Sequence, residues 1–286
     1  MFSLEGVFDL HVHAYPDVIM RVDDDLTIAK KCKAAGMCGM AVKAMQESTT
    51  SRAYYVNQFV DGFRMVGGIC LNYPVGGLNP SAVDTCLRTG GRIVWMPTIQ
   101  SKFHAELKGR LGKGSDGLCY YNPTGATGIT VFSEQGELLP EVKEIVALIK
   151  ERNAVLATSH LSPEEIVALA KYCEQEKTKC VITHLGWTSQ YNFELGQEAI
   201  AHKAIVELTA VTFGGFAHKM KLDDCISFIR SWGRENIVLS TDAGAIRFVQ
   251  PCEYLRSFAE YLVSGGIPKE DIRYMMTDQP LRLIAE

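Results

Sequence analysis

Short apolar runs alternate with helix-like segments along the whole chain. The apolar runs have the length of strands and lie at 6–13, 38–45, 64–71, 92–96, 154–160, 180–184, 204–210 and 237–242. Segments with helical periodicity follow them at 24–35, 50–61, 80–89, 140–152, 162–176, 192–202, 221–232 and 252–264. Eight such pairs require parallel strands with right-handed crossovers, and that number favours a closed barrel over an open sheet. We predict an α/β fold, a (β/α)8 TIM barrel, as a single domain over residues 1–286.

One stretch interrupts this alternation. Residues 97–129 follow the fourth predicted strand, are rich in Gly and are too long for an ordinary connection. We predict a lid or site-covering loop there. The next residues, GITVFSEQGELLP, predict a small hairpin or an extended excursion before the following helix.

Composition narrows the class of function. The formal net charge of -4 gives no basic footprint for nucleic acid, so a small-molecule substrate is the better expectation. Nine dispersed Cys residues without a C-x-x-C pair predict reduced thiols. The N-terminus lacks the layout of a signal peptide and no segment has the apolar length of a membrane span, so we predict a cytoplasmic protein without a membrane partner. A homo-oligomer stays open, because no segment identifies an interface.

Metal-ligand side chains cluster at the ends of the predicted strands. Alternate residues of an extended strand share a face, so the side chains of His11 and His13 in VFDLHVH converge. Three later strands end at His160, His184 and Asp242. In a barrel these ends meet at the catalytic face, where imidazole and carboxylate bind a divalent ion such as zinc, manganese or iron. Water on that ion ionises near neutral pH, and Asp242 is placed to act as general base.

VFDLHVH, the two later single histidines and the aspartate of LSTD together resemble the signature of the amidohydrolase superfamily. The resemblance spans nearly the whole chain. It implies metal ligation by His11, His13 and His160, with Asp242 as a fourth ligand or base. His184 would bind a second metal or hydrogen-bond the substrate.

The same resemblance bears on the number of ions. Many binuclear members carry a carbamylated lysine at the end of strand four, whereas here that strand reads RIVWMPT. We therefore expect one ion rather than two, with zinc first. The fragments around Lys43 (MAVK) and Trp95 (VWMPT) resemble an uncharacterised branch of the superfamily.

Several side chains are candidates for substrate binding. Lys43 ends the second predicted strand, where an ammonium suits a substrate anion or a developing oxyanion. Further candidates follow other strands and would extend a cationic or aromatic lining: Arg21, Arg52, Trp95, Thr98, His104 and Arg247. Glu207 and Glu134 are more readily interpreted as ordinary hydrogen-bonded or solvated glutamates than as extra ligands.

The leading hypothesis is a metal-dependent hydrolase that uses activated water on an amide, lactam, lactone or related C–N or C–O bond. The substrate would be a small molecule, and small anions are among the candidates. Asp242, His184 and Lys43 would be the catalytic residues. A metal-dependent decarboxylase or other lyase on the same scaffold, a phosphoester hydrolase, and a non-catalytic metal-binding barrel stay open as alternatives.

Overall fold

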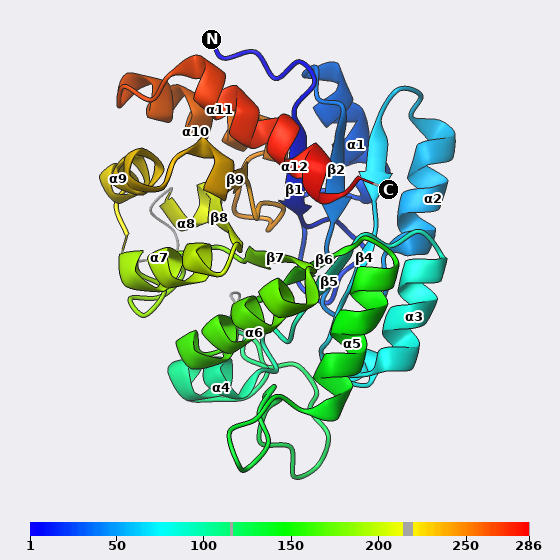
Figure 1. The fold of residues 1–286 in the computed structure, drawn as a ribbon. Helices are drawn as coiled ribbons and strands as arrows, with labels where there is room; N and C mark the ends of the chain where they lie inside the picture. The colour runs from blue at the N-terminus through cyan, green and yellow to red at the C-terminus, as the bar shows by residue number, and fades with distance from the viewer. Residues whose placement is uncertain (115–116, 214–219, 286) are drawn as a thin grey trace.

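Strands and helices alternate through residues 1–114, 117–213 and 220–285, which the computed structural model describes (Figure 1). The strands are β1 (Phe8–Val12), β2 (Gly39–Val42), β3 (Arg64–Val66), β4 (Gly68–Cys70), β5 (Ile93–Trp95), β6 (Val155–Ala157), β7 (Lys179–Ile182), β8 (Ile205–Thr209) and β9 (Ile237–Ser240). Every pair of neighbouring strands is parallel. The predicted α/β class is confirmed.

The strands form two sheets, in the orders β1-β2-β3 and β4-β5-β6-β7-β8-β9. The strand predicted at 64–71 is divided between β3 and β4 at Gly67. A Cβ on Gly67 would lie 2.7 Å from the Cα of Thr50, so only a glycine lets the chain pass this close to the start of the preceding helix. At the other edge, His13 N donates to Ala243 O (2.8 Å) and Asp242 N donates to His11 O (2.9 Å). β1 is thereby hydrogen-bonded to the residues that follow β9.

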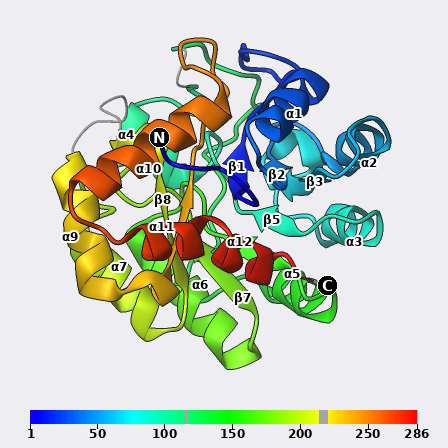
Figure 2. The same cartoon turned by 90° about the horizontal axis from the view of Figure 1, so that it is seen from above.

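Helices cover the outside of the strands (Figure 2). They are α1 (Asp25–Ala34), α2 (Thr50–Phe59), α3 (Pro80–Arg88), α4 (Lys102–Lys108), α5 (Pro140–Glu151), α6 (Pro163–Glu176), α7 (Phe193–Ala201), α8 (Ala210–Phe213), α9 (Leu222–Trp232), α10 (Pro251–Ser264), α11 (Lys269–Met276) and α12 (Asp278–Leu283), with 3-10 turns η1 (Tyr73–Val75) and η2 (Arg234–Asn236). Among the described residues, no helix is long and apolar enough to cross a bilayer.

Short helices that the sequence did not predict complete the fold. α12 contacts β1 and β9, and Leu283 and Ile284 join the apolar cluster inside the sheets. That cluster includes Phe8 and Ile93, the first residues of β1 and β5. The end of the sheets where the strands begin is therefore filled with apolar side chains, and the other end is left for polar ones.

The stretch predicted to be irregular, 97–129, contains α4. Ser101 caps this helix by accepting a hydrogen bond from His104 N, and Gly109 ends it in the left-handed region, with φ at 72°. A Ser cap and a terminal Gly are ordinary helix signals, but α4 is too short for its periodicity to be recognised. The predicted hairpin is confirmed by an antiparallel bridge between Phe132 and Leu138. The predicted lid role stays a prediction, and residues 115 and 116 of this stretch lie outside the described residues.

Candidate metal centre

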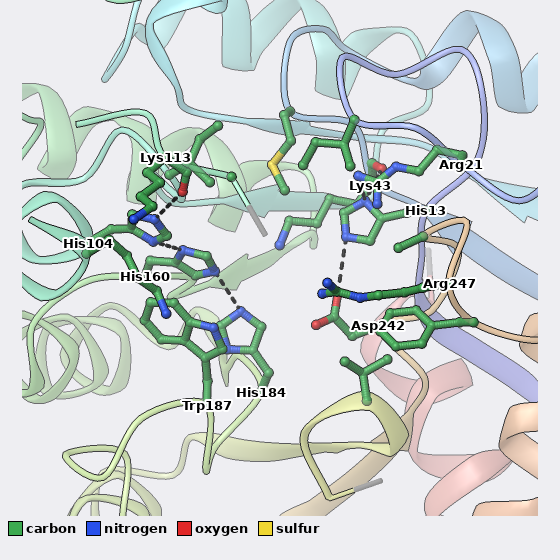
Figure 3. A pocket seen from close by; sticks show the side chains of 18 of the residues that line it. His13, Arg21, Lys43, His104, Lys113, His160, His184, Trp187, Asp242 and Arg247 are labelled. Atoms are coloured by element: carbon green, nitrogen blue, oxygen red, sulfur yellow. Dashed lines mark hydrogen bonds and ion pairs between the residues drawn. The ribbon is translucent and has the colours of Figure 1, made fainter. Parts of the chain in front are cut away.

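A cavity of about 410 Å³ opens where the strands end. Its walls include His13 after β1, Lys43 after β2, His160 after β6, His184 after β7 and Asp242 after β9 (Figure 3). Residues predicted from five separate strand ends are therefore brought to one cavity. His11 lies below them and is completely buried.

Hydrogen bonds fix the rings of His11 and His13. His11 Nδ1 donates to the carboxylate of Glu207, 3.2 Å from both oxygens. His13 Nδ1 lies 2.9 Å from Lys43 O, and because a carbonyl only accepts, this ring nitrogen donates. The guanidinium of Arg21 lies 3.0 Å from the same nitrogen and donates instead to Asp17 (2.9 Å). Both rings thus turn Nε2 toward the carboxylate of Asp242.

These two Nε2 atoms meet the carboxylate of Asp242. Asp242 Oδ1 lies 3.1 Å from His11 Nε2 and 3.2 Å from His13 Nε2. Burial, together with the nearby charge of Arg21, holds the pKa of His13 well below its ordinary value, so that ring is neutral. Burial raises the pKa of Asp242, but His11 and His13 outweigh it and the pKa lies far below the ordinary value. Two imidazole nitrogens and a carboxylate oxygen therefore converge, and a divalent cation is the group that such a ligand set fits.

His160 and His184 form a second group in the same cavity. Their Nε2 atoms lie 3.1 Å apart. Burial lowers the pKa of His184 to about 4 and that of His160 well below its ordinary value, so both rings are neutral. Lys43 points into the space between this pair and the pair His13–Asp242 (Figure 3). Its Nζ lies 3.3 Å from His11 Nε2.

Glu207 holds the two groups together. Its carboxylate accepts from His11 Nδ1, from the backbone N of His184 (2.9 Å) and from Ser240 Oγ (2.7 Å). Burial alone would raise the pKa of Glu207, but His11 and its other partners lower it, so the side chain is ionised. The interpretation as a hydrogen-bonded glutamate agrees with these contacts. A carboxylate in the middle of the apolar run IVELT is the sequence signal for this role.

Strained backbone accompanies the cavity. His184 and Asp242 have φ of 38° and 54°, in the left-handed region that residues other than Gly rarely adopt. Ser159, which precedes His160, has φ of 53°. Each of these residues is the second one after the end of its strand, so the chain turns sharply close to the point where it presents a polar side chain. Gly244 continues the turn after Asp242 with φ of 129°.

Gly244 gives the first testable prediction. A Cβ at this position would overlap the carbonyl oxygen of His13, and an Ala would also be strained at this φ. We expect Gly244→Ala to lower the free energy of unfolding by about 1–3 kcal/mol and to weaken metal binding, because His13 must move. Chemical denaturation and metal titration measure both. Gly136→Ala is the matched control, since its positive φ is similar in kind and its Cβ would meet nothing within 4 Å. Equal losses in the two variants would contradict the specific contact with His13.

The predicted substrate-binding residues separate into two sets. Lys43, Arg21, His104 and Arg247 line the cavity. Arg52 does not, because Asp25 and Glu47 bind its guanidinium (2.6 and 3.0 Å).

Trp95 and Thr98 are also absent from the cavity wall. Trp95 packs inside the sheets beneath His11, with ring centroids 6.1 Å apart. Thr98 is completely buried and is held by Asn72.

His104 lines the cavity but is not cationic at neutral pH. Burial lowers its pKa to about 4, and its Nδ1 lies 2.8 Å from His160 Nδ1. The cationic role that was predicted for it is replaced by a contact with another histidine.

Two lysines of the segment after β5 were not predicted. Lys108 and Lys113 line the cavity, and Lys108 Nζ lies 5.3 Å from the ring centre of Trp187. Burial and the charge of Lys113 lower the pKa of Lys108. Within the described residues, neither Lys43 nor Lys108 has a carboxylate partner. The cavity therefore presents more positive than negative side chains.

Several solved structures share this fold. An amidohydrolase from Pseudomonas aeruginosa is similar with a TM-score of 0.66 and 13% identity, over 99% of this chain and 97% of that chain. A β-aspartyl dipeptidase from Fervidobacterium islandicum, in complex with a β-Asp-Leu dipeptide, has a TM-score of 0.61 and 14% identity over 98% and 75%. A phosphotriesterase homology protein from Escherichia coli, complexed with phosphate in its active site, has a TM-score of 0.57 and 13% identity over 99% and 100%.

At these identities the likeness shows the fold alone. The comparison with curated proteins found no match. A family model described as a family of unknown function, DUF6282, matches residues 6–207. Since this match covers most of the chain, the protein belongs to the DUF6282 family and has the fold of amidohydrolase- and phosphotriesterase-like proteins.

Proposed function

We propose that this protein is a metal-dependent hydrolase of small molecules. The observation that carries the proposal is the convergence of His11 Nε2 and His13 Nε2 on Asp242 Oδ1, at 3.1 and 3.2 Å, at the ends of parallel strands. Proteins similar in fold include an amidohydrolase and a dipeptidase. The hydrogen bonds between β1 and the residues after β9 support one closed eight-stranded barrel that forms a single domain.

The ion would be held by His11, His13 and Asp242, with His160 and His184 facing it from the opposite wall. We propose one ion per chain, zinc first and manganese or iron as alternatives. When bound, it supplies Lewis acidity and makes a water molecule more acidic. Glu207 and the carbonyl of Lys43 fix the ligand rings, which is the usual role of the partners behind metal-binding histidines.

The protein's own groups would perform the proton transfers and stabilise charge. Asp242 is ionised and only partly buried, so it can accept a proton from water and pass it to the leaving group of an amide, lactam or lactone. Lys43, which points between the two groups, would donate a hydrogen bond to the oxygen on which negative charge develops, and His184 would orient the substrate from the wall beside His160. The bonds cleaved would be C–N or C–O bonds of the carbonyl group.

The charge of the cavity favours an anionic substrate. Lys108 and Lys43 have no carboxylate partner within the described residues. Lys113 and Arg247 line the same cavity. A carboxylate or phosphate on the substrate would offset these charges in a partly dehydrated site. The solved structures that bind a β-Asp-Leu dipeptide and phosphate are consistent with this class of ligand. The same charges favour phosphoester hydrolysis as the second candidate.

A pair of esters tests the anionic preference. The neutral substrate is p-nitrophenyl acetate and the anionic one is p-nitrophenyl hemisuccinate. We expect Lys108→Gln to raise KM for the anionic ester about tenfold, because one hydrogen bond to a charged group is lost. KM for the neutral ester should not change. Lys143→Gln, which alters an exposed lysine on α5, is the control. The same change in KM for both esters would contradict an anion-binding role, and hydrolysis only of p-nitrophenyl phosphate would favour the second candidate.

A further inference from the structure

The segment after β5 is fastened to His160 at its backbone and at its ring. Ser101 Oγ, the cap of α4, donates to the backbone oxygen of His160 (2.6 Å) and accepts from His104 N (3.0 Å). His104 is only 3% exposed, and its ring lies nearly parallel to that of His160, with 9° between the planes. This helix therefore has two separate attachments to one candidate ligand.

The hydrogen bonds of His104 define which of its nitrogens carries the proton. His104 Nε2 lies 2.8 Å from Lys113 O. A carbonyl oxygen only accepts, so the proton is on Nε2, and in the neutral ring Nδ1 is then an acceptor. His104 Nδ1 lies 2.8 Å from His160 Nδ1, so His160 must donate across that contact. The same logic places the proton of His160 on Nδ1.

The consequence reaches the cavity. With its proton on Nδ1, the neutral His160 ring has a free electron pair on Nε2, and that atom faces His184 Nε2 at 3.1 Å. His184 donates across this contact and is left with an unprotonated Nδ1, which has no hydrogen-bond partner among the described residues. The carbonyl of Lys113 thus sets which ring nitrogen carries the proton in His104, His160 and His184, which are linked by hydrogen bonds in that order.

We propose that His104 is a positioning residue, which transmits the hydrogen bond of the Lys113 carbonyl to His160 and keeps His160 Nε2 unprotonated for a metal ion. The opposite tautomer of His160 would put a proton on the atom that faces the cavity and would block it as a ligand. The metal-binding part of this inference rests on the proposed function. The tautomer part does not, because it follows from the contacts of His104 alone.

The first test needs neither metal nor turnover. Metal-free protein labelled with 15N-histidine is examined by long-range 1H–15N correlation spectroscopy, which distinguishes protonated from bare ring nitrogens. We expect the proton on Nδ1 in His160 and on Nε2 in His104, with the His160 signals identified by their loss in His160→Gln. A proton on Nε2 of His160 in the native protein would overturn the proposal.

Two substitutions separate the two hydrogen bonds. Asn places its carbonyl oxygen near the position of Nδ1, whereas Gln places its amide near that of Nε2. His104→Asn should therefore keep an acceptor for His160, and His104→Gln should keep only the contact with Lys113. We expect zinc affinity, measured by competition with a fluorescent chelator, to fall about 10–100-fold in His104→Gln and less than about threefold in His104→Asn.

Equal losses of zinc affinity in both variants, or none in His104→Gln, would overturn the positioning role. The spectrum of His104→Gln provides a second readout, since His160 should lose its single Nδ1-protonated form there and keep it in His104→Asn. If the native protein shows the expected tautomers and binds no zinc, manganese or iron, the proposed function and the metal-binding part fail while the tautomer part stands.

Discussion

His11→Ala should abolish metal binding and hydrolysis together. His11 lies between Glu207 and Asp242, and its Nε2 is one of three atoms that converge on the candidate ion site. Its removal leaves two ligands and takes one hydrogen-bond donor from the buried carboxylate of Glu207. Removal of a residue that only hydrogen-bonds a ligand lowers metal affinity by up to about 100-fold. Because His11 is itself a ligand, we expect its loss to lower metal affinity by more than about 100-fold. Elemental analysis of protein purified without added metal measures the content directly.

His202→Ala is the matched control, because His202 lies at the surface and bonds Glu174 (2.9 Å), far from the cavity. It should retain the metal content of the native protein. About one ion per chain in the native protein, lost in His11→Ala, is the expected result, and about two would mean that His160 and His184 hold a second ion. Full metal content in His11→Ala, or none in the native protein after reconstitution, would contradict the proposed centre.

Asp242→Asn should lower kcat by about 10²–10⁴-fold, the range for removal of a general acid or base. Asn keeps an oxygen at nearly the same place but cannot accept the proton from water. Because a neutral amide is also a weaker ligand than a carboxylate, the assay is run at saturating metal and the metal content of the assayed protein is measured. Asp84→Asn, which alters an exposed partner of Arg88, serves as the control and should leave kcat unchanged.

Two results would separate the roles of Asp242. Full metal content with strongly reduced kcat would assign it the proton transfer, whereas loss of the ion with activity restored by added metal would assign it mainly to ligation. Full metal content together with full activity would contradict both. The strained φ of 54° at this residue makes Asn a suitable replacement, since Asn tolerates the left-handed region better than most residues.

Much of the site could be predicted because the sequence patterns that indicate it are local. His11 and His13 alternate on one strand, and period-two alternation decides the face of a side chain without any knowledge of its neighbours. The positions of His160, His184 and Asp242 after apolar runs predicted their place at the strand ends, and the cavity contains all three. Parallel strands bring such ends to one side of the sheet whatever the rest of the chain does.

The sequence by itself thus determined the alternation of strands and helices, the strand ends and the residues most suited to hold an ion. Only the tertiary structure decided that His160 pairs with His184 and His104, that Glu207 binds His11 across 196 positions of sequence, and that Asp25 and Glu47 draw Arg52 away from the cavity. It also brought Lys108 to the wall. These outcomes depend on hydrogen bonds and ion pairs between distant segments, and the partner of a polar group is set by packing rather than by the residues beside it in the chain.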